Sequence, residues 1–192
     1  MDYLSKDDAR KKYLKIRDNI TERNIKENKI FEFICNSNFF INAKVIAIYN
    51  SFKSEVSTKK LIDYMLEFGK IVCIPKVIGN NMEFYKISSI NDINYKNSFG
   101  IYEPKDYTFN LIKKSDIDIM IIPGICFDYE GNRVGFGMGY YDKYLSGLSV
   151  CKIGICFDEQ LLYQNKLLCD HFDVKMDIII TDRTIINLIK KT

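Results

Sequence analysis

The sequence lacks the features that assign a chain to several special classes of protein. No apolar run approaches the ~20 residues that a membrane-spanning helix requires. Residues 1–17 are charged from position 2 onward and contain no apolar core of a secretory signal. With 28 basic and 25 acidic residues the formal charge is only +3, so charge gives no strong attraction to nucleic acid or to an anionic membrane. We therefore expect neither as a partner.

Paired cysteine motifs are also missing. The absence of any Cys-x-x-Cys pair argues against zinc and dithiol redox sites. The cysteines are instead scattered through apolar surroundings, which favours reduced, mostly buried thiols in a cytoplasmic protein. There are six of them: Cys35, Cys73, Cys126, Cys151, Cys156 and Cys169.

No linker rich in Gly, Ser or Pro, no low-complexity tract and no internal repeat divides the chain. The 192 residues are 47% hydrophobic and 14% aromatic, which is typical of a globular chain that buries a sizeable core. We predict that residues 1–192 form a single domain, and we expect it to be a monomer.

Apolar runs alternate with helical patterns along the sequence. Two helices are predicted over residues 6–36, separated at 19–21 and with Ile25, Ile30 and Ile34 on one stripe. Further helices are expected over 61–68 and from about 139 to 145, and residues 88–115 are polar and irregular. The predicted strands are 44–50, 70–75 (stopped by Pro75), 82–87, 116–124, 151–157 and 176–182. Uninterrupted apolar strands predict an α/β domain with a mostly parallel central sheet and helices on both faces, a Rossmann-like three-layer fold.

The segment "RVGFGMGYYDKYL" (133–145) has glycines at alternate positions directly before an aromatic run. One interpretation is a glycine-rich turn at a sheet edge followed by packing tyrosines. The other is a cradle for an anion, because glycines let backbone N–H groups approach a ligand and the start of a helix adds unpaired donors. Arg133 would add a positive charge that can bind the anion through two parallel hydrogen bonds. The pattern is neither a Walker motif nor the dinucleotide fingerprint, so the residues alone leave both interpretations open.

The longer stretch "PGICFDYEGNRVGFGMGYYDKYL" (123–145) resembles the signature of the 5-formyltetrahydrofolate cyclo-ligase (methenyltetrahydrofolate synthetase) family. Three other segments resemble the family in the same order: "YNSFKSEVST" (49–58), "FGIYEP" (99–104) and "HFDVKMDIIITD" (171–182). Lys6 and Arg10 match its N-terminal basic pair. Met138 is a departure, since members often carry Lys or Arg between the second and third glycines.

The resemblance implies an enzyme that closes 5-formyltetrahydrofolate to 5,10-methenyltetrahydrofolate, with ATP as co-substrate and Mg²⁺ as cofactor. It assigns catalytic roles to Arg133 and Tyr140 and metal binding to Asp142 and Asp173. The implied folate residues are Asn50, Glu55, Phe99, Phe136 and Tyr140. The implied ATP residues are Lys6, Arg10, Arg133, Val134, Gly135, Phe136, Gly137, Met138, Gly139, Tyr140 and Tyr141.

Several of these residues also have a purely structural interpretation. Lys6 and Arg10 lie one helical turn apart and could form a solvated face. Glu55 could cap the helix that follows it, and Phe99 could fill a core.

The two aspartates and the activity have alternatives as well. Asp142 could merely complement a helix dipole and Asp173 could cap a turn. The single histidine, His171, is given no catalytic role because two carboxylates suffice for magnesium. The alternative function is a non-catalytic nucleotide-binding or sensing protein that keeps the phosphate cradle.

Overall fold

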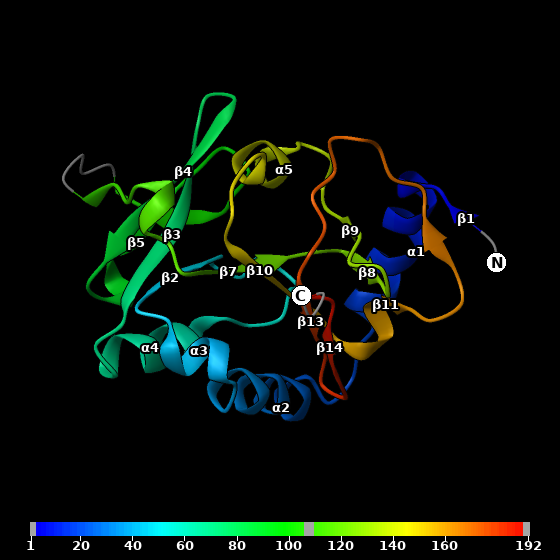
Figure 1. Cartoon of the computed structure of the whole chain (residues 1–192), viewed down its shortest axis with the longest axis horizontal. Coiled ribbons are helices and arrows are strands. Elements are labelled where there is room, and N and C mark those ends of the chain that lie inside the picture. Colours follow the sequence, from blue (N-terminus) through cyan, green and yellow to red (C-terminus); the bar gives the residue numbers. More distant parts are fainter. Residues whose placement is uncertain (1–2, 106–109, 190–192) are drawn as a thin grey trace.

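The computed structural model describes residues 3–105 and 110–189, and its centre is a seven-stranded sheet (Figure 1). The five central strands are parallel, and an antiparallel strand closes each edge. In spatial order the strands are β14 (Ile185–Asn187), β13 (Ile178–Ile180), β10 (Cys151–Ile155), β7 (Ile119–Pro123), β2 (Val45–Ile48), β3 (Ile71–Ile78) and β4 (Asn81–Ile87). The prediction of a mostly parallel sheet is confirmed.

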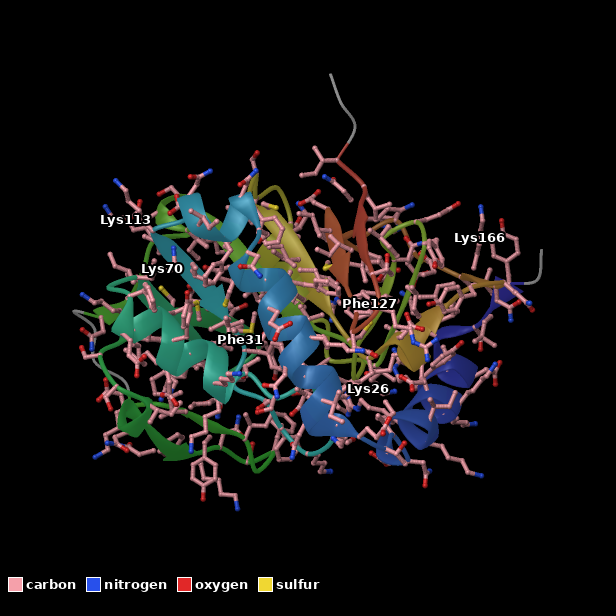
Figure 2. All side chains as sticks on the ribbon, turned by 90° about the horizontal axis from the view of Figure 1, so that it is seen from below. Lys26, Phe31, Lys70, Lys113, Phe127 and Lys166 are labelled. Atoms are coloured by element: carbon pink, nitrogen blue, oxygen red, sulfur yellow. The ribbon has the colours of Figure 1, made fainter. Side chains whose placement is uncertain are left out.

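Helices cover both faces of this sheet, so the predicted three-layer arrangement is confirmed (Figure 1). One face carries α2 (Arg23–Cys35), α3 (Asn38–Asn42) and α4 (Lys59–Glu67). The other face carries α5 (Tyr140–Leu145), whose Tyr144 and Leu145 join a second apolar layer. Figure 2 shows the contrast between interior and surface: Phe127 lies within the layers, whereas Lys113 and Lys166 lie at the periphery.

Helix α1 (Lys6–Asp18) does not cover the central sheet and packs instead on a small side sheet. The Ser5 hydroxyl caps α1 by accepting the N–H of Asp8 at 3.2 Å. A short strand before it, β1 (Tyr3–Leu4), pairs with β12 (Lys166–Leu167). The side sheet has the order β11 (Leu161–Leu162), β8 (Cys126–Asp128) and β9 (Arg133–Val134).

The structure extends or corrects several local predictions. The region 88–115 contains the hairpin of β5 (Ile93–Lys96) and β6 (Tyr102–Pro104), although residues 106–109 lie outside the described residues. The described residues also include the short 3₁₀ helices η1 (Ile90–Asp92), η3 (Lys114–Asp116) and η4 (Asp158–Gln160). Ile25 is 56% exposed, so its place on a buried stripe was wrong, whereas Ile30 and Ile34 are buried. All six cysteines are free thiols, and Cys169 is exposed.

Pro75 does not stop its strand, because β3 continues through it to Ile78. Its partner in β4 is Phe84, whose carbonyl accepts the N–H of Ile112 at 2.9 Å on the opposite side. Pro75 and Phe84 therefore form a pair that is not hydrogen-bonded. On the other side of β3 the pairing with β2 ends at Cys73, so no N–H of Pro75 is required there either. Proline is tolerated in a strand at such a position. Among the described residues, no helix has both the length and the apolar character needed to cross a membrane.

Phe127 of β8 is fully buried against Gly154 of β10 and Gly124, the residue after β7. A β-carbon added at Gly154 would lie 2.4 Å from Cε1 of the Phe127 ring. A β-carbon added at Gly124 would lie 2.5 Å from Cε2 of the same ring. The ring thus occupies the space that side chains at these two positions would fill.

We predict that Gly154→Ala lowers the free energy of unfolding by about 1–3 kcal/mol, because a methyl group is forced into a filled site. Urea unfolding measures the change. In the double variant with Phe127→Leu, the loss should be smaller than the sum of the two single losses, because the smaller side chain makes room for the methyl group. Strictly additive losses would contradict this packing.

Candidate active site

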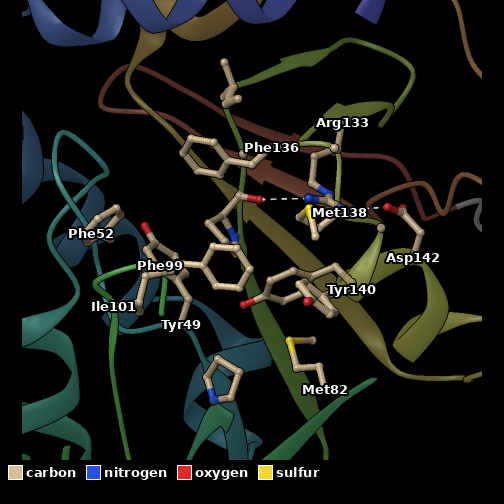
Figure 3. Close-up of a pocket in the computed structure, with 18 of the residues that line it drawn as sticks. Tyr49, Phe52, Met82, Phe99, Ile101, Arg133, Phe136, Met138, Tyr140 and Asp142 are labelled. Atoms are coloured by element: carbon tan, nitrogen blue, oxygen red, sulfur yellow. Dashed lines mark hydrogen bonds and ion pairs between the residues drawn. The ribbon is translucent and has the colours of Figure 1, made fainter. Parts of the chain in front are cut away.

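A pocket of about 520 Å³ opens beyond the carboxyl ends of β2 and β7. Ligands bind at this place in open α/β sheets. Figure 3 shows that much of its wall is aromatic or apolar, with Tyr49, Phe99, Phe136, Tyr140 and Met82 around the cavity. The pocket brings together every residue that the sequence assigned to a ligand: Lys6, Arg10, Asn50, Glu55, Phe99, Arg133, Val134, Gly135, Phe136, Gly137, Met138, Gly139, Tyr140, Tyr141, Asp142 and Asp173.

The glycine segment divides into a hairpin and a loop that lines the pocket. Residues 126–134 form a hairpin of β8 and β9. Residues 135–139 form a loop that lines the pocket and leads into α5. Gly137 has φ 98°, a conformation that side chains other than glycine rarely adopt. Because α5 has only six residues, cationic side chains rather than the helix give this end of the pocket its positive charge.

Arg133 is the most enclosed of these cations, with a side chain only 6% exposed. Its Nη2 lies 3.0 Å from Oδ2 of Asp142, and its Nη1 donates to the carbonyl of Pro123 at 3.4 Å. The guanidinium also lies 5.4 Å from the ring centroid of Tyr141. Its Nε is buried and has no acceptor among the described residues. A buried donor without a partner is unfavourable, so an anionic oxygen brought to this point would be stabilised.

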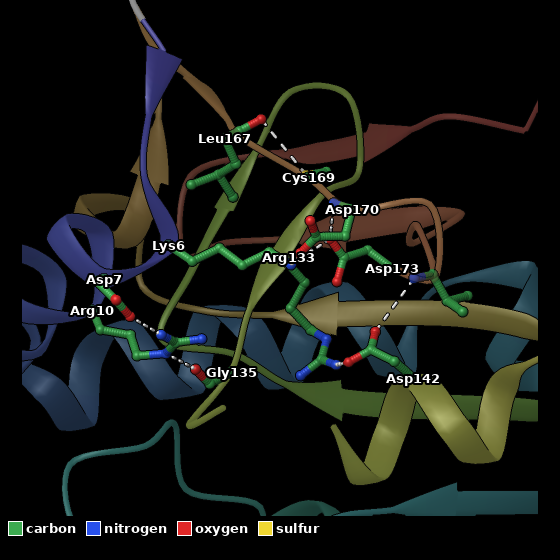
Figure 4. Close-up of polar contacts among 11 residues, drawn as sticks. Lys6, Asp7, Arg10, Arg133, Gly135, Asp142, Leu167, Cys169, Asp170 and Asp173 are labelled. Carbon is green, nitrogen blue, oxygen red and sulfur yellow. Dashed lines mark hydrogen bonds and ion pairs between the residues drawn. The ribbon is translucent and has the colours of Figure 1, made fainter. Parts of the chain in front are cut away.

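Lys6 and Arg10 place two more cations at the same end of the pocket (Figure 4). Lys6 Nζ lies 2.8 Å from Oδ2 of Asp170 and 2.5 Å from Oδ2 of Asp173. Burial opposes the charge of Lys6, but the hydrogen bonds and charges of the two aspartates raise its pKa above the ordinary value. Arg10 donates from Nε to the carbonyl of Gly135 at 2.8 Å and so holds the glycine loop. These contacts replace the alternative of a solvated face.

The two predicted metal ligands, Asp142 and Asp173, lie on segments that contact each other. Oδ1 of Asp142 accepts the N–H of Val174, the residue after Asp173, at 3.3 Å. Each carboxylate already has a cation beside it, Arg133 or Lys6. Within the described residues no three acidic, histidine or cysteine side chains gather as a metal cage. Two carboxylates at a phosphate-sized anion site fit Mg²⁺, which takes one or two protein carboxylates and fills its octahedron with water and phosphate oxygens.

Glu55 lines the same pocket from a tight turn. Its Oε2 accepts the N–H of Phe52 at 2.9 Å, and its own N–H donates to the Phe52 carbonyl at 3.2 Å. Burial raises the pKa of this carboxyl, although the bond from Phe52 and the charge of Arg17 oppose the shift. Because the carboxylate bonds within its own turn and the N-cap of α4 is Thr58, the alternative of a helix cap is not supported.

The predicted residues Asn50 and Phe99 line the same cavity. The Asn50 side-chain amide donates to the carbonyl of Tyr102 at 3.0 Å. Phe99 is 48% exposed at the pocket, so it does not fill a core. His171 does not line the pocket and packs its ring against Phe172 at 5.2 Å between centroids.

Sequence reasoning missed several lining residues, most of which are apolar or aromatic and carry no distinctive chemistry. They are Tyr49, Phe52, Lys53, Pro75, Val77, Met82, Ile101, Tyr102, Glu103, Pro123, Gly124, Ile125 and Phe172. Tyr49 could have been found, since it directly follows β2 and ligands of open α/β sheets bind beyond the carboxyl ends of the strands. Met82 could not, because its strand, β4, is added antiparallel at the sheet edge.

A parallel sheet with a pocket beyond its carboxyl ends, aromatic at one end and cationic at the other, defines an α/β protein with a built small-molecule site. A sequence profile of the 5-formyltetrahydrofolate cyclo-ligase family matches residues 3–182, and the chain belongs to this family.

Relatives of known name agree with this membership. The chain is 34% identical over 157 residues to the probable 5-formyltetrahydrofolate cyclo-ligase of Schizosaccharomyces pombe, covering 74% of this chain and 77% of that protein. It is 33% identical to the enzyme of Haemophilus influenzae, covering 86% and 92%. The solved 5,10-methenyltetrahydrofolate synthetase of Aquifex aeolicus superposes with a TM-score of 0.84 at 30% identity, covering 97% of this chain and 94% of that one.

The buried Glu55 gives a pH-dependent prediction. A carboxyl whose pKa is higher in the folded than in the unfolded state binds more protons when folded, so its contribution to stability is lost as the pH rises through the folded pKa. Glu55→Gln should therefore stabilise the protein at about pH 7 and have little effect at about pH 4, near the ordinary glutamate value.

Urea unfolding at the two pH values measures the effect. Glu32→Gln, at an exposed position of α2, is the matched control and should change stability equally little at both. A destabilised Glu55→Gln variant at neutral pH would show that the charged carboxylate supports the fold.

Proposed function

We propose that this protein catalyses the ATP-dependent closure of 5-formyltetrahydrofolate to 5,10-methenyltetrahydrofolate, releasing ADP and phosphate. The observation that carries the proposal is the convergence of two unlike half-sites in one pocket. An aromatic chamber with the buried carboxyl of Glu55 adjoins a glycine loop surrounded by Lys6, Arg10 and Arg133. Membership of the cyclo-ligase family and the names of its relatives support the same reaction.

The reaction needs activation because the oxygen of a formamide is a poor leaving group. Transfer of the γ-phosphoryl group of ATP to the formyl oxygen converts it into a phosphate ester. The N10 nitrogen then attacks the formyl carbon, the carbon–oxygen bond breaks, and phosphate leaves. Such transfers depend mainly on positioning and on neutralising charge around the phosphoryl group, so the protein needs no nucleophile of its own.

The phosphates are proposed to lie against residues 134–141, with Lys6 and Arg133 neutralising their charge. The buried, unpartnered Nε of Arg133 supports this role, because an incoming oxygen would give it an acceptor. Arg10 keeps the loop in place through Gly135. When Mg²⁺ is bound, Asp142 and Asp173 would hold it, and it would supply further neutralisation of the phosphate charge.

The folate is proposed to occupy the aromatic chamber. Glu55 accepts hydrogen bonds from the amino-pyrimidinone edge, and Phe99 and Phe136 face the ring system. Asn50 borders the chamber beside Tyr102. Tyr140 stands where the chamber meets the glycine loop (Figure 3) and orients the formyl group toward the phosphates.

The proposed enzyme uses residues 1–192 as one domain and acts as a monomer, since elements from α1 to the segment of Asp173 line the pocket within one chain. A cytoplasmic location agrees with the free state of all six cysteines. The test is an absorbance assay in the near ultraviolet, where the methenyl product absorbs and the substrate does not. Growth of this absorbance should require ATP. Binding of ATP without product formation would instead identify a nucleotide-binding protein without this activity.

We predict that Arg133→Ala reduces kcat/KM for ATP by roughly 10- to 150-fold, since it removes a charge-assisted contact of about 1.5–3 kcal/mol. Arg133→Lys should recover only part of the activity, because the two-pronged geometry is lost. The matched control is Arg183→Ala, at an exposed arginine outside the pocket. Unchanged use of ATP by Arg133→Ala would reject the proposed cradle.

The proposed metal ligands are tested by titrating magnesium. Asp142→Asn and Asp173→Asn should each raise the magnesium concentration that half-maximal activity requires. The double variant should lose much less than the product of the two single losses, because both changes weaken one site. A single variant that titrates like the parent protein would show that its residue is not a ligand.

A further inference from the structure

Arg17 of α1 is the largest fully enclosed side chain in the described part of the protein, with 1% of its surface exposed. It ends the inner stripe of the helix that begins with Ala9 and Tyr13. A charged side chain is seldom enclosed so completely unless it is paired. Arg17 does not line the pocket, so its position calls for an explanation other than direct contact with a ligand.

One side of Arg17 supports the turn that carries Glu55. Its Nε donates to Oγ of Ser54 at 3.1 Å, and Ser54 Oγ in turn donates to Asp18. Arg23 of α2 donates from Nη2 to the carbonyls of Ser54 and Glu55 at 2.8 and 3.0 Å. Side chains from two helices therefore hold this turn from behind, on the side away from the cavity.

The other side of Arg17 contacts the glycine loop. Its guanidinium carbon lies 5.7 Å from the ring centroid of Phe136, within range of a cation–π attraction. Phe136 lines the pocket and is 55% exposed, so a bound ligand would order it. The Nη1 of Arg17 is buried and has no acceptor among the described residues. The guanidinium thus bridges two segments that contribute different half-sites, but one of its donors is left to be satisfied.

We propose that Arg17 is a positioning residue that couples the two half-sites, an inference that rests on the proposed function. Binding of ATP orders the glycine loop and with it Phe136, which fixes the guanidinium of Arg17. The bond from Nε of Arg17 to Ser54 then restrains the turn that carries Glu55. ATP and 5-formyltetrahydrofolate then bind with positive cooperativity, and each raises the affinity for the other by the same factor. Couplings between sites in proteins are typically about 5- to 150-fold.

Isothermal titration calorimetry tests the coupling directly. The Kd of a non-hydrolysable ATP analogue is measured with and without saturating 5-formyltetrahydrofolate, and the reverse titration gives the reciprocal factor. We expect at least about a fivefold coupling in the parent protein, within the usual range. Arg17→Met keeps a long side chain for the core but removes the guanidinium, and it should reduce the factor below about twofold, under that range. Lys15→Met, at an exposed position of the same helix, is the control and should retain the coupling.

A second variant keeps the proposal testable if Arg17→Met does not fold. Ser54 lies outside the pocket. Ser54→Ala removes the acceptor of the Arg17 Nε bond, together with the bond that the same hydroxyl donates to Asp18, and it should also weaken the coupling. The proposal would be overturned if Ser54→Ala and a folded Arg17→Met kept the coupling factor of the parent protein. It would also be overturned if these variants bound both ligands more weakly but with an unchanged coupling factor. A parent protein that binds both ligands independently would overturn it and leave the proposed function standing. A parent protein that binds neither ligand would contradict the proposed function itself.

Discussion

The packing of Phe127 against Gly124 and Gly154 is the contact on which the pocket depends. Gly154 lies in β10 of the central sheet and Gly124 directly follows β7, whereas Phe127 belongs to the side sheet. In the β8–β9 hairpin, Phe127 is the register partner of Arg133. The depth at which the ring enters the central layers therefore sets the position of Arg133 and of the glycine loop that follows. Gln160 ties the same region further by donating to the carbonyl of Ile125 at 2.8 Å.

Carboxylates keep the cationic end of the pocket stable without a ligand. A cation removed from water and left unpaired is strongly unfavourable, and Lys6 and Arg133 each have an aspartate beside them. In the proposed enzyme, phosphate oxygens would share or replace these partners, and the freed aspartates would become available to a cation. The ion pairs are thus a preorganised form of the site, in which the charges stand close to where the ligand needs them.

The sequence predicted the fold well wherever one apolar run forms one element. Strands such as β2 and β7 are continuous, largely buried apolar runs, and few other structures accommodate them. Short elements were missed because β1, β12 and β14 have only two or three residues, too few to show periodicity. Their pairing is set by tertiary contacts, as is the continuation of β3 through Pro75.

The site was predictable to the same extent, from chemistry placed directly after strands. Asn50 and Glu55 follow β2, and the β8–β9 hairpin with its glycine loop follows β7, so these segments meet at one edge of the sheet. All the predicted site residues line the pocket. Arg17 was missed, although a signal exists. Lys6, Arg10 and Arg17 are spaced by four and seven residues, which places all three on one face of α1. A basic face is normally solvated, so only the tertiary structure shows that this one points inward.

The pocket is also where the chain departs from what folding alone favours. Three buried side-chain atoms lack a partner among the described residues, namely Arg17 Nη1, Arg133 Nε and the hydroxyl of Tyr144. Two of the three are guanidinium nitrogens: Arg133 lines the pocket, and Arg17 packs against Phe136 of its wall. Glu55 adds a carboxyl whose pKa is raised by burial. Unfavourable local features of this kind persist where the other interactions of the fold are favourable enough to compensate for them. Here the two apolar layers around the central sheet supply that compensation. Arg133 and Glu55, taken without any motif, therefore mark the same pocket that the motifs mark.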